Sequence, residues 1–241
     1  MFALQSKYSE KAMHFPGDPA VADHLAQTHF CDHAHPTIMQ RARAMARTAS
    51  DATDLVRHVF LFVRDQIVFG GDHWRTTASC TLRKGYGACF NKNLLMISLL
   101  RALQIPATLM GNPLRNTFTR PCVGWASVFF SNPFYHCFTR VSVKGRWVDL
   151  DPTLDRGTYD VFYKPAGVAW SIDWDGRGDM LLYTESLTGP PRAFTDIDQA
   201  LNRNLESYFL FRGEPGWLLH AWLRFGNWKM WRKTGRRPDV A

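Results

Sequence analysis

Apolar residues recur at intervals of three and four positions in the first third of the chain. Between residues 54 and 67 they are Leu55, Val56, Val59, Phe60, Val63 and Ile67. This spacing predicts an amphipathic helix with one buried face. Thr53 is a suitable cap for its start, and Gly70-Gly71 would end it. A helix is also predicted over 36–49, because Pro36 suits the first helical turn.

A third helix is predicted over 89–103, and it is the most apolar of the three. Its inward positions are Leu95, Leu99, Leu100 and Leu103, and Pro106 lies just beyond its end. Proline cannot continue a helix, so the helix should stop before residue 106. We expect this helix to lie buried at the centre of the domain.

The pattern then changes from helical spacing to strands. Residues 123–130 and 135–143 are rich in aromatic and β-branched side chains, which favour strands. Lys144-Gly145 predicts a two-residue hairpin turn, since glycine readily adopts positive φ. Residues 146–151 would form the returning strand. Helices followed by an antiparallel hairpin predict an α+β fold.

The hairpin turn also predicts which residues face each other. If Lys144 and Gly145 form the loop, Val143 pairs with Arg146, Phe138 faces Asp151 and His136 faces Thr153. Side chains alternate between the two faces of a strand, so His136 and Asp151 share a face. They would be diagonal neighbours, about 7–8 Å apart at the backbone. Asp149 lies one step further from the histidine and is the poorer partner.

Beyond Pro152 many glycines and prolines predict loops and short strands up to about residue 200. The tail from 201 is predicted to be helical, with an aromatic stripe at Leu218, Trp222, Phe225, Trp228 and Trp231. We therefore divide the chain into a main domain, 1–200, and a basic, aromatic helical extension, 201–241. Packing of the stripe on the domain is the commoner use of such a pattern. Tryptophans beside lysine and arginine also fit a peripheral membrane or partner contact.

Composition narrows the class of protein. The formal net charge is +8, and residues 201–241 carry eight Lys and Arg against three Asp and Glu, which is 8 − 3 = +5. No nucleic-acid-binding motif accompanies this charge, so we expect no nucleic-acid partner. The first residues show no signal peptide, and no stretch is apolar enough to span a membrane. Five scattered cysteines indicate reduced thiols, and we expect a cytoplasmic protein.

Candidate chemistry centres on Cys89, which follows the turn Gly85-Tyr86-Gly87-Ala88 at the start of the third helix. Free N–H groups and the helix dipole stabilise a thiolate there. His136 and Asp151 follow later in the chain. A histidine can take the thiol proton, and an aspartate can orient the histidine.

Other polar residues suggest less specific roles. Lys92 could lower the pKa of the thiol or bind a substrate carboxylate, and a solvated lysine is an equally good interpretation. A group of metal-binding residue types lies at His24, His29, Cys31, Asp32, His33 and His35. Their spacing matches no strong zinc pattern, so we expect no metal.

Three separate motifs resemble those of the transglutaminase-like superfamily, whose core is of the papain type. The segment 85–89 resembles the approach to the family's cysteine, and 99–107 resembles its LLRA-x-GIPA helix end, with Gln104 where glycine is usual. His136 followed by 145–153 resembles its histidine strand and D-P-T segment. Upstream, 62–67 resembles a helix ending in VRD-x-I. The resemblance covers roughly residues 28–185.

The resemblance implies that Cys89 is the nucleophile, His136 the general base and acid, and Asp151 the orienting carboxylate. The backbone N–H of Cys89 is one candidate oxyanion donor, with Trp74 or Asn91 as a second. The implied reaction is acyl transfer from a peptide, protein or small-molecule amide or thioester to an amine, with no cofactor. With water as acceptor the same residues would make a cysteine peptidase or amidase. A non-catalytic peptide-binding module is a further alternative.

Overall fold

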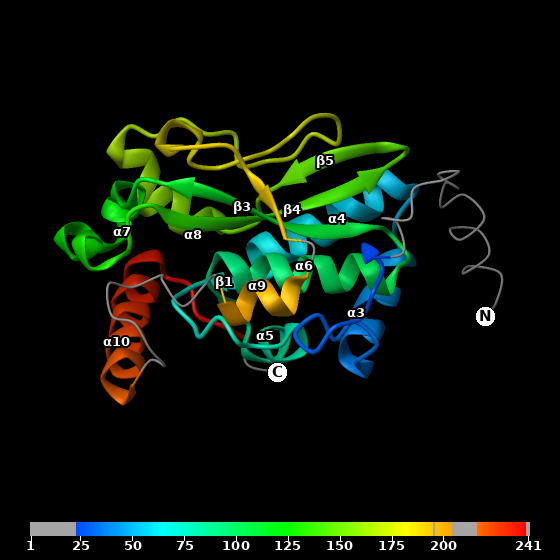
Figure 1. Ribbon diagram of the computed structural model, residues 1–241, viewed down its shortest axis with the longest axis horizontal. Helices are drawn as coiled ribbons and strands as arrows, with labels where there is room; N and C mark the ends of the chain where they lie inside the picture. Colours follow the sequence, from blue (N-terminus) through cyan, green and yellow to red (C-terminus); the bar gives the residue numbers. More distant parts are fainter. Residues whose placement is uncertain (1–22, 195, 204–215, 240–241) are drawn as a thin grey trace.

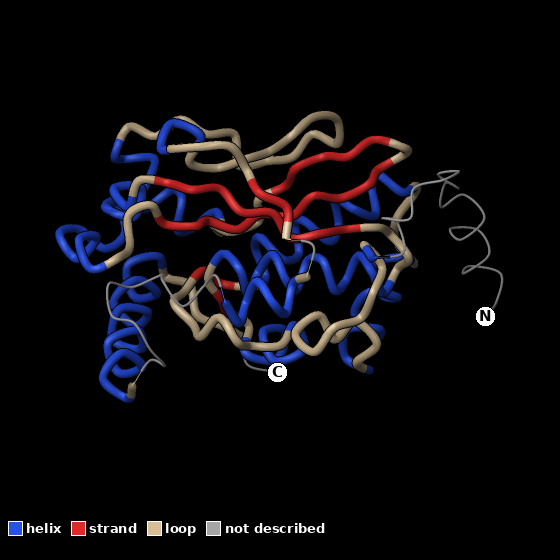
Figure 2. The backbone as a smooth tube through the Cα atoms, viewed as in Figure 1, coloured by secondary structure: helices blue, strands red, loops and turns tan. Residues whose placement is uncertain are grey.

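The computed structural model describes residues 23–194, 196–203 and 216–239. One helix, α6 (Cys89–Ala102), lies between a sheet and other helices (Figures 1 and 2). It packs on strands β3 (Ala107–Leu114) and β4 (Phe134–Val143) on one side. On its other sides lie α3 (Pro36–Ala46), α4 (Ala52–Gln66) and α5 (Ala78–Lys84). The predicted α+β fold is confirmed.

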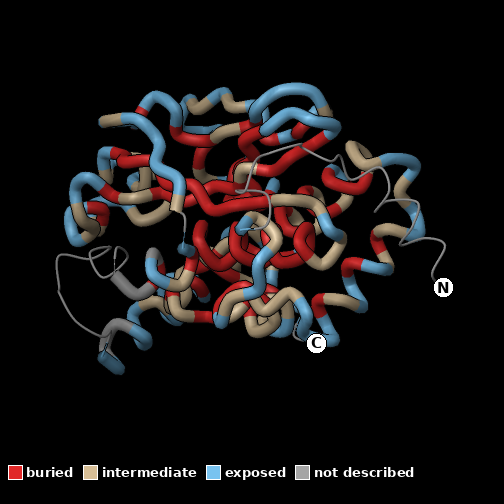
Figure 3. Tube along the Cα trace, turned by 45° about the vertical axis from the view of Figure 1, so that its right-hand side comes forward, coloured by how far each residue is buried: buried red, intermediate tan, exposed pale blue. Residues whose placement is uncertain are grey.

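The main sheet has four strands in the order β5-β4-β3-β6, with β5 at Arg146–Leu150 and β6 at Arg192–Ala193. All its pairings are antiparallel. A small parallel pair joins β1 (Val68–Phe69) to β2 (Tyr86–Gly87). Helix α6 and strands β3 and β4 are the most buried elements, and buried stretches run through the middle of the molecule in Figure 3.

The predicted hairpin register is confirmed. Val143 pairs with Arg146, and the turn residues Lys144 and Gly145 have φ of 47° and 82°. Both φ angles are positive, as a two-residue turn of this type requires. The ladder ends at Thr139 and Leu150. Beyond it the returning strand exchanges backbone hydrogen bonds with Met180, which leaves Asp151 at the end of the paired region.

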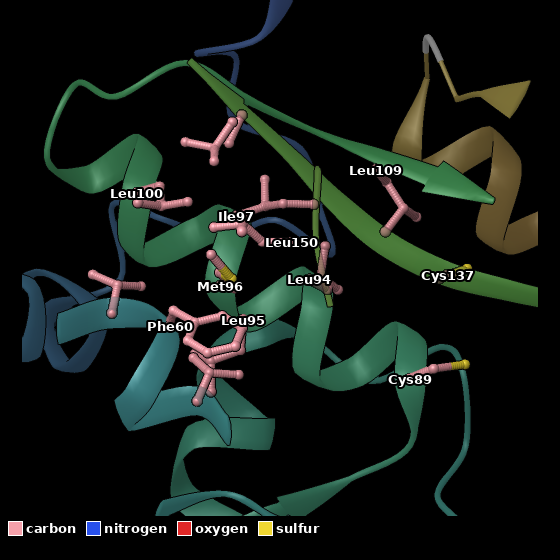
Figure 4. Packing of buried hydrophobic residues seen from close by; sticks show 14 of the residues in the cluster. Phe60, Cys89, Leu94, Leu95, Met96, Ile97, Leu100, Leu109, Cys137 and Leu150 are labelled. Atoms are coloured by element: carbon pink, nitrogen blue, oxygen red, sulfur yellow. The ribbon is translucent and has the colours of Figure 1, made fainter. Parts of the chain in front are cut away.

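The third predicted helix is also confirmed, and α6 is buried on all sides. Its side chains Leu94, Leu95, Met96 and Ile97 are fully buried in succession, so it shows no polar face (Figure 4). Gln104, where the family motif has glycine, sits at φ 60° in the left-handed region. This conformation explains why glycine suits the position.

Three predicted helix boundaries are wrong. Helix α4 is capped by Asp51, whose side chain accepts from the Asp54 N–H, and not by Thr53. The helix ends at Gln66, because the next residue is extended and leads into β1. Gly70-Gly71 therefore does not end the helix. The first predicted helix ends at Ala46, three residues before position 49.

The predicted strand over 123–130 is wrong. The segment holds the short helix α7 (Arg120–Val123) and the 3-10 turn η2 (Gly124–Phe129), preceded by η1 (Asn116–Thr119). Gly124 between them has φ 61° and ψ −133°, which breaks an extended chain. The third long strand is β3 instead, which the pattern did not reveal. All eight of its residues are buried, so it shows no alternation of apolar and polar positions.

Short irregular elements connect β5 to β6, as expected from the glycines and prolines. They are the short helix α8 (Arg156–Thr158), the π-helix η3 (Tyr159–Tyr163) and the 3-10 helices η4 (Lys164–Ala166) and η5 (Thr184–Ser186). None of the described helices is long and apolar enough to cross a membrane.

The C-terminal region contributes two helices, α9 (Ile197–Arg203) and α10 (Trp217–Thr234). Helix α9 runs across residue 200, where the sequence suggested a boundary between domain and extension; that division stays a prediction. Asp198 in α9 accepts hydrogen bonds from Thr28, His29 and Phe30, which joins the helix to the start of the described chain.

Helix α10 docks on the segment that contains Gly70 and Gly71. The Asn227 amide donates to the Gly71 carbonyl at 2.9 Å and accepts from the Gly71 N–H at 2.8 Å. The Trp231 indole donates to the Phe69 carbonyl at 2.9 Å. A Cβ on Gly71 would lie 2.6 Å from Leu223, so the glycines allow the close approach of α10.

Only part of the aromatic stripe of α10 faces the domain: Trp231 docks on it, while the other rings of the stripe are largely exposed. Trp222, Phe225 and Trp228 are 39%, 58% and 51% exposed, and the docking residues lie on the opposite side of the helix. Of the predicted stripe, Trp231 donates a hydrogen bond to the domain, while the side chain of Leu218 lies outside the described residues.

Candidate active site

Cys89 is the first residue of α6, as predicted. The preceding strand β2 enters through Gly85, which has φ 68°, and Ala88 is extended before the helix begins. The Cys89 side chain points away from the hydrophobic cluster, at the open end of the helix (Figure 4). A thiol at this position faces the unsatisfied N–H groups of the first helical turn.

His136 and Asp151 come together across the end of the β4–β5 pair. Nε2 of His136 lies 2.6 Å from Oδ2 of Asp151. Both side chains are almost inaccessible, at 2% and 0% exposure. The other carboxylate oxygen of Asp151 accepts from the Thr153 N–H at 3.1 Å. Both oxygens of Asp151 accept hydrogen bonds, so the carboxylate and the ring of His136 are held in fixed positions.

The ring of His136 also forms a hydrogen bond with the Cys89 thiol. Burial alone lowers the pKa of His136, but the charge and hydrogen bond of Asp151, together with Cys89, raise it to about 10. Burial raises the pKa of the Cys89 thiol, but contacts with Cys137 and His136 outweigh burial and bring it well below its ordinary value. The favoured state is a thiolate paired with an imidazolium.

Asn93 ties the two elements of the site together. Its amide donates to the Cys89 carbonyl at 2.8 Å and to the Cys137 carbonyl at 2.9 Å. Its carbonyl accepts from the Thr139 hydroxyl at 2.8 Å. Helix α6 is therefore held to β4 next to Cys89. The sequence analysis did not single out Asn93, although it is a fully buried amide one turn after Cys89.

Aromatic rings enclose the histidine. The Tyr183 ring meets the His136 ring edge-on, with centroids 4.8 Å apart, and Phe118 lies 4.6 Å from Tyr183. Tyr183 adopts φ 61°, an unusual conformation for a bulky residue, so the backbone there is strained. Sequence reasoning missed Tyr183, because it lies in the irregular region after β5 where no periodic pattern exists.

The candidate oxyanion donors fall in different places. Trp74 is 5% exposed, stacks on His73 at 4.6 Å and lines the cavity beside Cys89. The Asn91 side chain instead accepts from the Ala88 N–H at 3.0 Å and donates to the His73 carbonyl at 2.9 Å. Asn91 thus holds the turn before Cys89 against the segment carrying Trp74, and its amide does not point at the substrate space.

The position of Lys92 does not suit the roles that we considered for it. The ammonium is fully buried and donates to the Arg64 carbonyl at 3.0 Å and the Ile67 carbonyl at 2.7 Å. These carbonyls belong to the end of α4, so Lys92 satisfies a helix terminus. It is neither solvated nor part of the cavity wall. Burial lowers its pKa to about 7, although nearby carboxylates oppose the change.

A cavity of ≈ 460 Å³ opens onto Cys89 and His136. Its deeper walls are mostly aromatic and apolar: Trp74, Phe90, Phe118, Phe130, Phe134, Tyr163 and Tyr183. Trp125, Trp222 and Phe225 line its more exposed part together with Lys229 and Lys233. The space is large enough for a sizeable apolar group next to the thiol.

The histidine-rich segment 24–35 is used for structure. Asp32 accepts from the Ser79 N–H and hydroxyl, and the His35 ring accepts from the Thr37 N–H at the start of α3. Within 23–194, 196–203 and 216–239, no group of three or more His, Cys, Asp or Glu is arranged to hold a metal. All five cysteines are thiols.

Comparison with known proteins places this site in a family. Residues 39–152 match the family model described as "Transglutaminase-like superfamily". A solved structure of a protein from Cytophaga hutchinsonii, proposed to be a cysteine protease, is 18% identical with a TM-score of 0.45, covering 57% of this chain. Red sea bream transglutaminase is 12% identical with a TM-score of 0.39, covering 92% of this chain. This chain spans 43% and 42% of those two proteins.

A search of curated proteins found no significant match. The family match extends from α3 to the end of β5 and contains Cys89, His136 and Asp151. The chain therefore contains a domain of the transglutaminase-like superfamily.

Proposed function

We propose that this protein is a thiol acyltransferase, which moves an acyl group from an amide or thioester to an amine. The observation that carries the proposal is the buried contact of Cys89 with a histidine whose Nε2 lies 2.6 Å from Asp151. Cys89 and His136 line an apolar cavity large enough for a donor. We place the reaction in the cytoplasm, because five reduced thiols suit a reducing compartment.

In the first half of the reaction the Cys89 thiolate attacks the donor carbonyl and forms a carbon–sulfur bond. The carbon–nitrogen or carbon–sulfur bond of the donor breaks, and the His136 imidazolium gives its proton to the leaving group. Asp151 keeps the ring oriented throughout and stabilises its positive charge. The product of this half is an acyl group on Cys89.

Negative charge develops on the carbonyl oxygen during the attack. The backbone N–H of Cys89, at the first turn of α6, is the candidate donor from the main chain. The indole N–H of Trp74 is the candidate from a side chain, because Trp74 lines the same cavity. Together they would supply two hydrogen bonds to the oxyanion.

In the second half an amine attacks the acyl-enzyme. His136 takes the proton from the amine nitrogen, the bond between Cys89 and the acyl carbon breaks, and the thiolate returns. The aromatic walls support an amine as acceptor, because an apolar site limits competition from water. With water in place of the amine, the same steps would make the protein a cysteine peptidase or amidase.

Intact-mass spectrometry tests the proposal directly. The protein is incubated with a panel of apolar acyl thioesters and aryl amides, and the mass of one acyl group on Cys89 is expected. Added amines should then release the adduct as amide faster than water releases it as acid. Faster release by water would favour the peptidase or amidase alternative.

A Cys89→Ala variant provides the control, since it should bind donors without forming an adduct. If no donor in the panel modifies the wild-type protein at Cys89, while a donor binds reversibly, the protein is a binding module and the proposal is wrong.

A further inference from the structure

An exposed aromatic surface surrounds the mouth of the cavity. We define this aromatic rim by the residues Trp125, Val128 and Phe129 of η2 and Trp217, Trp222, Phe225 and Trp228 of α10. Their exposed fractions run from 37% for Phe129 to 78% for Trp125. A group of large apolar side chains this exposed commonly marks an interaction site.

The two halves of the rim lie beside each other although they are distant in sequence. The ring of Trp222 contacts Phe130, just after η2, with centroids 6.4 Å apart. Both Trp125 and Phe225 line the cavity that opens onto Cys89. Helix α10 and the α7–η2 segment occupy the same end of the molecule (Figure 1). The rim is therefore one surface, and the cavity opens within it.

The orientation of α10 is the reverse of what an ordinary surface helix adopts. It holds the domain through Leu223, Asn227 and Trp231 and turns Trp222, Phe225 and Trp228 outward. A helix packed on a core normally buries its apolar stripe and exposes its polar face. Within the part of the chain that the structure describes, the aromatic side of α10 stays largely exposed.

Charge on α10 indicates the kind of partner. Residues 217–234 contain Arg224, Lys229, Arg232 and Lys233 and no Asp or Glu. The cations lie directly over rings: Lys229 is 5.6 Å from the centroid of Phe225, and Arg232 is 5.6 Å from that of Trp228. Mixed tryptophan and lysine or arginine is typical of the membrane–water interface.

The same composition disfavours another protein, or a second copy of this chain, as the partner of the aromatic rim. Cores of protein–protein interfaces are depleted in lysine. A second copy would bring two surfaces of the same positive sign together, within a chain whose net charge is +8. An anionic bilayer supplies both an apolar layer for the tryptophans and negative headgroups for the cations.

We infer that the aromatic rim docks this protein peripherally on anionic lipid bilayers, with the mouth of the cavity turned toward the membrane. An apolar acyl group could then pass from the bilayer into the cavity beside Cys89 without crossing water. The docking itself does not depend on the proposed chemistry and is tested separately from it.

The test measures binding of the full chain to vesicles by sedimentation and by the blue shift of tryptophan fluorescence. Vesicles of phosphatidylcholine alone are compared with vesicles that contain about 30% phosphatidylglycerol. We expect binding to the anionic vesicles only, and weaker binding as salt is raised. An Arg224→Gln/Arg232→Gln variant should bind roughly tenfold more weakly, and so should Trp217→Ser/Trp228→Ser.

Matched control variants remove arginine and tryptophan side chains at positions away from the aromatic rim. Arg43→Gln/Arg47→Gln takes two exposed charges from the region of α3, and Trp147→Ser removes an exposed tryptophan of the β4–β5 hairpin. Both should bind within about twofold of the wild type.

Three results would overturn the inference. The full chain could fail to bind anionic vesicles. Both arginine pairs could weaken binding equally, which would show a general charge effect. Light scattering could show a dimer that Trp217→Ser/Trp228→Ser dissociates, without vesicle binding, which would make a second copy the occupant. Acylation of Cys89 is measured separately with soluble donors, so failure of the docking leaves that result intact.

Discussion

Strand β4 forms two pairs of a basic and an acidic residue, one with Asp149 of β5 and one with Asp151 just after β5, and the two pairs differ in one respect. Arg140 and Asp149 are joined by two hydrogen bonds of 2.6 and 2.8 Å, with the arginine side chain 35% exposed. His136 and Asp151 are joined at 2.6 Å, with both side chains almost fully buried. The geometry is similar, but water reaches only the first pair.

Burial decides what each pair can do. An exposed ion pair exchanges with water and contributes little, about 0.2–1 kcal/mol to stability. In the buried pair the carboxylate has no competing solvent, so it raises the pKa of His136 to about 10 despite the cost of burial. A histidine held as imidazolium then stabilises the Cys89 thiolate. The same residue types thus form a structural pair at one position and reactive groups at the other.

The largest effect is expected from removing the buried carboxylate charge. Asp151→Asn should reduce the rate of acylation at Cys89 by about 10³–10⁴-fold, because the ring loses both its orientation and its charged partner. Asp149→Asn is the matched control and should change the rate by less than about threefold. Single-turnover acylation with the best donor measures both. If Asp149→Asn slows acylation more than Asp151→Asn does, Asp149 and not Asp151 is the carboxylate that acts on His136, and our assignment is wrong.

A smaller loss of acylation rate is expected from removing a candidate oxyanion donor. Trp74→Phe keeps an aromatic ring in the cavity wall and removes one N–H donor, which should slow acylation by about 10²-fold. Binding of the donor should change little, because the ring still fills the wall. A variant that acylates at the wild-type rate would show that Trp74 only packs, and circular dichroism checks that the fold is kept.

Lys92 sharpens the comparison, because it is a buried cation without a bonded carboxylate. Its pKa of about 7 lies below the ordinary 10.5, so the unfolded chain binds more protons between these values. Stability should therefore rise with pH from about 7 to 10.5, by about 2–5 kcal/mol from this group. Lys92→Met should lose this rise, measured by urea unfolding at both ends of the window.

Acylation by Lys92→Met should stay within about threefold of the wild type at neutral pH, since the ammonium bonds α4 carbonyls. A hundredfold loss in a folded variant would mean that Lys92 acts on the thiol after all.

The smallest effect is expected when the exposed pair is removed as a whole. Arg140→Gln/Asp149→Asn should lower the free energy of unfolding by less than about 1 kcal/mol, with acylation unchanged. Denaturant titration with the double variant and both single variants gives the coupling energy. A coupling of several kcal/mol would show that solvent exposure does not separate the two pairs.

Much of the site could be predicted because it depends on local rules. The turn at Lys144-Gly145 sets the register, and the register brings Asp151 rather than Asp149 toward His136. The apolar run after Cys89 predicts a buried helix that starts at the thiol. In each case a few neighbouring residues determine the geometry, and the structure agrees with it.

The remainder depends on contacts between distant segments. Strand β3 is buried on both faces and contains Gly111 and Pro113, so neither alternation nor propensity reveals it. The aromatic content of 123–130 favours a strand, but those side chains line and border a cavity. The position of Lys92 three residues after Cys89 does not show that its ammonium reaches the end of α4. Likewise the stripe on α10 does not reveal which side of the helix faces the domain.

The central claim is that Cys89 is a thiolate held by His136 and Asp151. The rate of its alkylation by iodoacetamide, measured peptide by peptide across pH, tests this claim most directly. We predict fast labelling that has already levelled off below pH 9, because the contacts with Cys137 and His136 hold the pKa of the Cys89 thiol well below its ordinary value. The rate should exceed that of the other four cysteines, and in Asp151→Asn the plateau should shift to higher pH. Labelling of wild-type Cys89 that rises steadily toward pH 9, at the rate of an ordinary thiol, would contradict the account.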